Sequence, residues 1–243
     1  MANLSIETTD GVAIMTLSHE EQNRFTTSFL TEISAGLATL AKDNAVRAVV
    51  VTGAQEKFFS TGIHLEWLMG QGMADIQNVL HFTRALNQTL MDATGFPKPL
   101  VAALNGHAVA GGAIFAACMD YRLMPPDRGF VRLPEVQINI PFWPGMTALF
   151  QAILPPASFR DMAYTGDRYT SAQAHDMGFV DELVASEALL PRAVELAAKL
   201  GQSKTETYAS IKREMRKHVL EVMRTQDPKA GEALLRSFEG GGS

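Results

Sequence analysis

The hydrophobic and polar positions of the chain follow two periods, and the changes between them outline a succession of strands and helices. Residues 12–17 (VAIMTL) and 47–53 (RAVVVTG) are rich in β-branched side chains and predict strands. Residues 27–41 place apolar side chains at helical spacing between those two strands. Alternating positions on both sides of Asp10-Gly11 indicate a hairpin at the start of the chain. The opening therefore predicts a hairpin followed by a β-α-β unit.

The alternation continues along the chain and then gives way to helices. We expect a helix over about residues 74–94, strands at 99–106 and 121–125, and a helix of small residues from Gly111 to Met119. Residues 171–178 (SAQAHDMG) predict a helix capped by Ser171 and closed by Gly178, and 179–184 predict a strand. These elements favour a layered α/β core with parallel strands.

The sequence also predicts how the chain is divided. We place the core at residues 1–185 and a helical extension at 186–243, because the extension has too little strand pattern to form a domain of its own. The extension is expected to pack on the core or on a neighbouring subunit. Residues 240–243 are rich in glycine, which is typical of a disordered tail or an added, non-native segment.

Composition and charge narrow the class of protein. The chain has 243 residues, of which 47% are apolar and 19% charged, so it can bury a core without disulfides or metals. Its apolar runs are shorter than the roughly 20 residues that cross a bilayer, so we expect no membrane insertion and a cytoplasmic location. The net charge is -5 and no long basic run occurs, which argues against a nucleic-acid partner.

Cysteine and histidine carry little chemistry here. The chain has a single cysteine, Cys118, in a setting typical of a small buried hydrophobe. The six histidines do not fall at metal-ligand spacing, and no Walker A or CxxC pattern is present. We therefore expect no metal, redox or P-loop site.

Two segments run from a strand through a glycine into a helix. The first is EKFFSTGIHLEWL at 56–68, with Gly62 before Ile63, and the second is NGHAVAGG at 105–112, with Gly111 and Gly112 opening a helix. In each, glycine serves either a tight turn and close packing or the presentation of a backbone N–H group to a ligand. The presence of two such segments favours the second role, because two N–H groups converging on one oxygen form an oxyanion hole.

The third segment of interest, RGFVRLPEVQINIPFWPG at 128–145, contains Glu135 among apolar residues. Such a setting raises the pKa of a carboxyl group toward the range that a proton shuttle needs. The alternative is a solvated acid in the first turn of a helix after a proline. Taken alone, the segment favours the solvated acid; the proton shuttle is favoured only in register with the two glycine segments.

Other polar and aromatic residues are interpreted more plainly. Asp120 and Asp127 flank a strand and a turn, where aspartates usually bond to backbone groups. His107 either borders a pocket or is a turn histidine bonded to the backbone, and we favour the latter. Phe142 and Trp143 lie between prolines and form either a pocket wall or core packing.

The segments KFFSTGIHL, NGHAVAGG, RGFVRLPEVQINIPFWPG and GFVDELV, in this order along essentially the whole chain, resemble the crotonase, or enoyl-CoA hydratase/isomerase, superfamily. The stretch 106–143 is most similar to the monofunctional 3,2-enoyl-CoA isomerases. The resemblance implies an α/β fold, a spiral of β-β-α turns whose C-terminal helical region assembles a homotrimer or a dimer of trimers. It also implies an acyl-CoA thioester substrate and no cofactor, with coenzyme A entering only as part of that substrate.

Carried over residue by residue, the resemblance assigns the oxyanion-hole N–H groups to Ile63 and Gly111. The substrate and CoA contacts it implies are Ser60, Thr61, Gly62, His64, Leu65 and Gly112. His64 stands where many relatives have an aspartate, so no charge-based role is transferred to it.

Water addition in this family usually uses two glutamates, and their positions here are Ile114 and Glu135. One carboxylate is therefore missing, and Glu135 is the catalytic residue that the resemblance leaves. The prediction is an isomerase that shifts a 3-enoyl-CoA double bond to the 2-position. The alternatives are a hydratase or another enolate-type acyl-CoA enzyme such as a thioester hydrolase, and a catalytically silent acyl-CoA-binding subunit.

Overall fold

The first element is the predicted hairpin. The computed structural model describes residues 3–240, in which β1 (Leu4–Thr9) pairs antiparallel with β2 (Val12–Leu17). The two residues between them, Asp10 and Gly11, have φ of 51° and 80°, as a type I′ turn requires. The hairpin prediction is confirmed. Of the predicted glycine tail, residues 241–243 lie outside the described part of the chain.

The chain builds two sheets, and from β3 to β8 successive strands alternate between them. One sheet has six strands in the order β1-β2-β3-β5-β7-β10, and the other has four in the order β4-β6-β8-β9. The remaining bounds are β3 Ala48–Gly53, β4 Phe58–Ser60, β5 Leu100–Ala103, β6 His107–Val109, β7 Tyr121–Met124, β8 Phe130–Arg132, β9 Arg168–Thr170 and β10 Glu182–Leu183. The pairs β3-β4, β5-β6 and β7-β8 are each followed by helices, so the expected spiral of β-β-α turns is confirmed.

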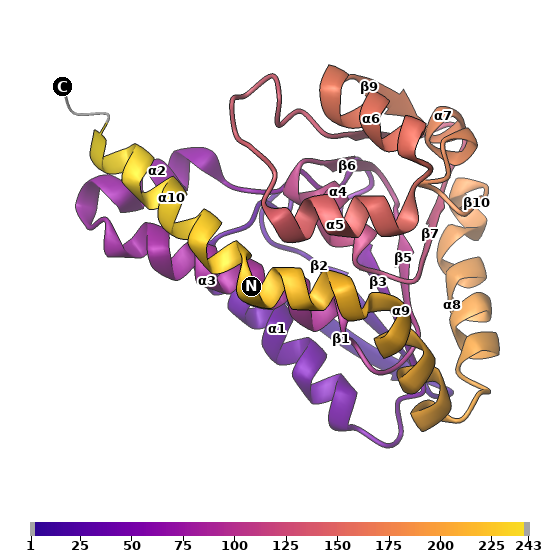
Figure 1. The fold of residues 1–243 in the computed structure, drawn as a ribbon. Coiled ribbons are helices and arrows are strands. Elements are labelled where there is room, and N and C mark those ends of the chain that lie inside the picture. Colours follow the sequence, from indigo (N-terminus) through magenta and orange to yellow (C-terminus); the bar gives the residue numbers. More distant parts are fainter. Residues whose placement is uncertain (1–2, 241–243) are drawn as a thin grey trace.

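The helices cover these sheets. Their bounds are α1 Thr27–Lys42, α2 Leu65–Ala74, α3 Gln77–Thr94, α4 Gly111–Ala117, α5 Pro144–Ile153, α6 Pro156–Thr165, α7 Ser171–Asp176, α8 Leu189–Leu200, α9 Thr205–Thr225 and α10 Asp227–Gly240, with a short 3-10 turn at Ser186–Ala188. Figure 1 shows α8 along one side of the larger sheet and α1 on the other. No helix in residues 3–240 has the length and apolarity needed to span a membrane.

The burial of β3 on both faces explains why its sequence does not alternate polar and apolar residues. Val49 and Val51 belong to the main hydrophobic core with α1 and α3, whereas Ala48 and Val50 pack in a second cluster with Ala193 of α8. A parallel strand covered on both faces needs apolar side chains at every position. The continuous β-branched run is therefore a property of the two-sided burial of this strand.

The region from residue 186 is helical as far as it is described. Helix α9 packs on α5 and α3, and α10 packs on α3 and α9. Figure 1 shows both helices lying across the face that carries α3 and α5. The domain boundary at 185 and the role of this region in trimer assembly stay predictions.

The helix expected over about residues 74–94 is confirmed as α3, although it begins at Gln77, where the Asp75 side chain accepts a hydrogen bond from Gln77 N (2.9 Å) in the turn after α2. Two local predictions are wrong. Helix α7 is capped by Thr170 instead of Ser171: Thr170 Oγ1 accepts from Gln173 N (3.3 Å), and Gln173 Oε1 accepts from Thr170 N (2.9 Å). The strand expected at 179–184 is reduced to the two residues of β10.

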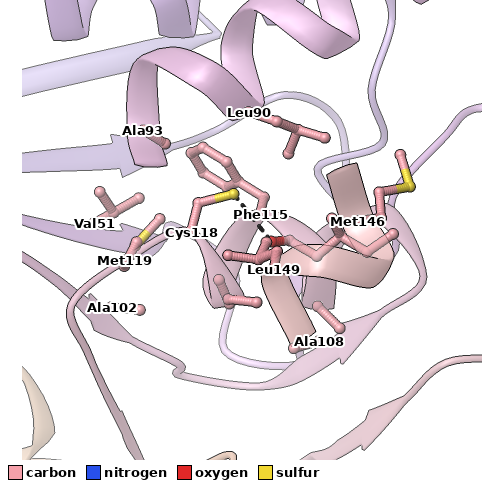
Figure 2. Packing of buried hydrophobic residues seen from close by; sticks show 14 of the residues in the cluster. Val51, Leu90, Ala93, Ala102, Ala108, Phe115, Cys118, Met119, Met146 and Leu149 are labelled. Carbon is pink, nitrogen blue, oxygen red and sulfur yellow. Dashed lines mark hydrogen bonds between the residues drawn. The ribbon is translucent and has the colours of Figure 1, made fainter. Parts of the chain in front are cut away.

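Cys118 is a core residue, as predicted. It is fully buried, and Figure 2 shows it among Leu90, Ala93 and Phe115. Its Sγ lies 3.3 Å from the carbonyl oxygen of Ile114. Burial raises the pKa of the thiol to about 11, so it remains a protonated thiol at neutral pH.

Candidate active site

The loop after β4 lies directly against the start of α4. Gly62 has φ of 80°, and a Cβ atom on it would lie 2.4 Å from the backbone nitrogen of Gly111. A Cβ atom on Gly112 would lie 2.1 Å from the carbonyl oxygen of Ser60. Both distances are far below contact, so only glycine fits where these two backbones touch. The two segments singled out in the sequence are therefore brought together.

Hydrogen bonds around this contact fix the direction of two peptide groups. The carbonyl oxygen of Gly62 accepts from Phe25 N (2.6 Å), and the carbonyl oxygen of Ala110 accepts from Ile114 N (3.0 Å). In a trans peptide the N–H group points away from the carbonyl. The N–H group of Ile63 is thus directed away from Phe25, and that of Gly111 points out of the N-terminal end of α4. Neither N–H group has a hydrogen-bond acceptor within residues 3–240.

Hydrogen bonds of the Ser60 and Asn23 side chains fix the conformation of the loop after β4. Ser60 is fully buried; its Oγ donates to the carbonyl of Asn23 (2.8 Å) and accepts from Gly62 N (3.1 Å). Asn23 is also fully buried, and its Nδ2 donates to the carbonyl of Phe59 (3.0 Å). The Ser60 side chain therefore positions Gly62. No sequence pattern marked Asn23 for this role, because its partners in the loop, Phe59 and Ser60, are distant in the chain.

Ala110 adopts a backbone conformation that L-residues rarely take. It has φ of 49° and ψ of -126°, and its N donates to the carbonyl of Arg132 (3.0 Å). Such a conformation costs on the order of 1–3 kcal/mol and persists only where the surroundings enforce it. Since Ala110 precedes Gly111, this conformation sets the orientation of the Gly111 peptide.

A cavity of about 160 Å³ lies in front of the two peptide groups. Ile63 and Gly111 line it together with Thr61, Leu65 and Glu135. The rest of its lining is apolar and comes from α3, α4, α5, Val109, Ala110 and the segment 134–143. Glu135 is the one ionisable side chain among the described lining residues. Larger hollows occur elsewhere on the protein, but none of them contains this combination of groups.

Glu135 is buried in a turn. Residues 135–139 form a turn after Pro134 and no helix, so the interpretation of Glu135 as a solvated acid in a first helical turn is wrong. The side chain is 6% exposed, and its buried Oε2 has no hydrogen-bond partner in the described residues. Burial raises the pKa of Glu135 to about 7, against smaller opposing effects of a backbone hydrogen bond and Arg132.

Several residues that were predicted to contact the substrate or CoA do not line the cavity. His64 is the N-cap of α2, and its Nδ1 accepts from Trp67 N (3.3 Å). Ser60, Gly62, His64 and Gly112 are not part of the cavity lining. Their assignment as substrate or CoA contacts stays a prediction.

The remaining residues that the sequence analysis weighed are also placed. The ring of His107 packs 4.0 Å from that of Phe130, and its Nδ1 has no partner in the described residues, so the expected side-chain bond to backbone is not found at that atom. Trp143 lines the cavity, whereas Phe142 packs against the ring of Phe150. Asp120 accepts from Leu100 N (2.9 Å), as expected of a structural aspartate.

Sequence reasoning missed part of the cavity. Phe82 and Leu86 of α3 and Met146 of α5 also line it. Their apolar positions follow the same helical period as ordinary core residues, so no signal in the sequence separates the two roles.

A family model described as enoyl-CoA hydratase/isomerase matches residues 7–238. Enoyl-CoA delta isomerase 1, peroxisomal, of Arabidopsis thaliana is 31% identical over 201 residues, which are 82% of this chain and 80% of the relative. A carnitinyl-CoA dehydratase of Salmonella arizonae is 35% identical over 170 residues, 70% of this chain and 63% of the relative. The structure of human mitochondrial delta3-delta2-enoyl-CoA isomerase has a TM-score of 0.92 at 23% identity and covers 98% of this chain and 93% of its own.

Proposed function

The chain belongs to the enoyl-CoA hydratase/isomerase family of acyl-CoA enzymes and has the crotonase fold, and on that basis we propose that it converts a 3-enoyl-CoA into a 2-enoyl-CoA. The observation that carries the proposal is the solitary Glu135 carboxyl group in an otherwise apolar cavity, with its pKa raised to about 7. The reaction needs one group that first removes a proton and then returns it. It uses no cofactor beyond the coenzyme A of the substrate.

Glu135 serves as the proton carrier in this proposal. Its carboxylate takes a proton from C2 of the acyl chain, and the electron pair forms a C1–C2 double bond while the carbonyl electrons move to the thioester oxygen. The resulting acid then gives the proton to C4: the carbonyl re-forms, the C2–C3 double bond forms, and the C3–C4 double bond is lost. A group with a pKa near neutrality is both a competent base and a competent acid. The absence of a hydrogen-bond partner at Oε2 in the described residues leaves that atom available for this transfer.

The N–H groups of Ile63 and Gly111 serve as the oxyanion hole. Proton removal places negative charge on the thioester oxygen of the dienolate, and two preorganised donors stabilise that charge. Their support is geometric: both peptide carbonyls are bonded on the opposite side, and both residues line the cavity that contains Glu135. The segment from Ser60 to Leu65 borders the coenzyme A portion.

Hydration of a 2-enoyl-CoA is the second candidate, favoured by the similarity to a carnitinyl-CoA dehydratase. Water addition requires that a water molecule be deprotonated as it attacks C3 while C2 receives a proton. Ile114, at the position of the second glutamate, is buried in the cavity wall and cannot take part in either transfer. One carboxylate performs both transfers less readily than two, and this favours isomerisation.

The test supplies the purified protein with 3-hexenoyl-CoA and, separately, with 2-hexenoyl-CoA in water, and follows the products by chromatography. We expect formation of 2-hexenoyl-CoA in the first reaction and much slower formation of 3-hydroxyhexanoyl-CoA in the second. Hydration as fast as isomerisation would replace the isomerase with a hydratase. Release of free CoA thiol would indicate a hydrolase, and binding without any turnover would indicate an acyl-CoA-binding subunit.

A further inference from the structure

The cavity that contains Glu135 has one open end and one sealed end. Leu65, Ile138 and Pro141 are exposed to solvent and mark the open end. The sealed end consists of buried side chains from three helices and the residue before α5: Phe82, Leu86, Ile114, Trp143 and Met146. An acyl chain that enters past Glu135 therefore meets a closed apolar wall.

The size of the cavity limits what fits against that wall. An apolar cavity of about 150 Å³ in another protein binds benzene, which has six non-hydrogen atoms. A cavity of about 160 Å³ thus holds a ligand portion of about six non-hydrogen atoms. Because Ile63 and Gly111 line the same cavity, this number includes the carbonyl carbon and oxygen, and it leaves room for about four further carbons.

The wall contributed by α5 is held in place by the C-terminal helices. Gly145, two residues after Trp143, donates its N–H to Asp227 Oδ1 at 2.7 Å, and Asp227 is buried. A Cβ atom on Gly145 would lie 2.4 Å from Met223 Cγ, so the first turn of α5 has no room to shift toward α9. Movement of α5 as a whole would break the Asp227 contact.

The wall contributed by α3 is held by the same region. Helix α10 packs on α3, and a Cβ atom on Gly231 would lie 3.0 Å from Thr83 Oγ1, next to Phe82. Both walls are thus braced by the C-terminal helices. A longer chain gains space only if a wall side chain becomes smaller.

We infer that this enzyme is specific for short acyl chains, up to about five carbons, and that Trp143 and Met146 set the limit. The inference rests on the proposed function for the identity of the substrate, since it assumes that an acyl-CoA chain enters this cavity. It names the substrate class that the sequence left open.

Binding of saturated acyl-CoAs tests the limit independently of the reaction. Calorimetric titration with acetyl-, butyryl-, hexanoyl-, octanoyl- and dodecanoyl-CoA should show affinity rising about fourfold per methylene up to about five carbons. It should show no further gain from hexanoyl- to dodecanoyl-CoA. A continued rise of about fourfold per methylene to dodecanoyl-CoA would overturn the inference.

Two variants test the residues that set the limit. Met146→Ala and Trp143→Phe each remove about three non-hydrogen atoms from the wall, and each should extend the rise in affinity to octanoyl-CoA. Met215→Ala is the matched control, because Met215 is 75% exposed and lies outside this cavity. A limit that is the same in both wall variants as in the wild type would remove Trp143 and Met146 from this role. Melting temperatures check that each variant is folded, and the milder Trp143→Phe decides the matter if Met146→Ala is not.

The failure of the two proposals can be told apart. If the predicted affinity profile appears but no 3-enoyl-CoA is isomerised, the proposed function fails and the chain-length limit stands. If 3-hexenoyl-CoA and 3-dodecenoyl-CoA are isomerised with equal kcat/KM, the limit fails and the proposed function stands.

Discussion

Replacing Glu135 with glutamine should lower activity and, above neutral pH, raise stability. The folded pKa of Glu135 is about 7, against an ordinary value of 4.5, and the cause is burial. A difference of about 2.5 in pKa corresponds to about 3 kcal/mol, the free energy by which the buried carboxylate destabilises the fold at high pH. Glutamine has nearly the same shape and carries no charge, so the variant avoids this cost.

The sign of the pH dependence follows from the raised pKa. The folded state favours the protonated acid, so wild-type stability is full below pH 4.5 and is lost as pH rises through about 7. The variant should match the wild type below pH 4.5 and exceed it by about 3 kcal/mol above pH 7. For a chain of this length, that is about 6 to 12 °C in Tm.

The measurement is Tm at pH 4, 6 and 8 for the wild type, for Glu135→Gln, and for Glu66→Gln as a control at an exposed position. In parallel, Glu135→Gln should lower the isomerisation rate by about 100-fold to 10,000-fold, and wild-type kcat/KM should rise with pH through about 7, because the base must be deprotonated. If Glu135→Gln is no more stable than the wild type at pH 8, or gains equally at pH 4, burial of a charged carboxylate is not the cause. Turnover within a few-fold of wild type would remove Glu135 from the mechanism.

Three further predictions address other groups. Ile63→Pro removes one N–H donor and should lower kcat by about 100-fold to 1,000-fold in a protein that circular dichroism shows to be folded. Ile63→Ala keeps the donor and serves as the control. Equal kinetics for the two variants would contradict the oxyanion hole. Ile114→Glu should raise the ratio of hydration to isomerisation, measured by product chromatography, and an unchanged ratio in a folded variant would show that the missing carboxylate does not decide the reaction. Burial raises the pKa of Asp227 to about 6 from 3.8, so the wild type loses stability as pH rises between these values. Asp227→Asn should match the wild type at pH 3.5 and be more stable by about 3 kcal/mol at pH 8. A difference in Tm between the two proteins that does not change with pH would refute this prediction.

The amino-acid sequence by itself determined the features that depend on near neighbours in the chain. The hairpin turn at Asp10-Gly11 requires only that two consecutive residues accept positive φ. The strand at 48–53 and the helix from Thr27 likewise follow from side-chain pattern. Gly62 and the start of α4 were marked as special by local composition, although the sequence left turn and ligand contact both open.

Only the tertiary structure decided how these segments meet. Gly62 and Gly111 lie far apart in the chain, and their contact depends on β4 and β6 being neighbours in the smaller sheet. The support from Asn23 and the strained Ala110 belong to the same contact. Neither has a sequence signature, because each conformation is enforced by partners from other elements.

Glu135 shows the difference most clearly. Its apolar neighbours in the sequence correctly predicted a raised pKa, yet Val136 is 51% exposed and Ile138 is 42% exposed. The desolvation comes instead from the fold, which places Ile114 and Trp143 in the wall of the same cavity. The apolar residues near Glu135 in the sequence determined that this segment would pack against another part of the protein, since burial of apolar surface is favourable. Which face was covered, and therefore which carboxyl lost its water, depended on residues brought together across the chain, and side-chain direction in a turn cannot be deduced from composition alone.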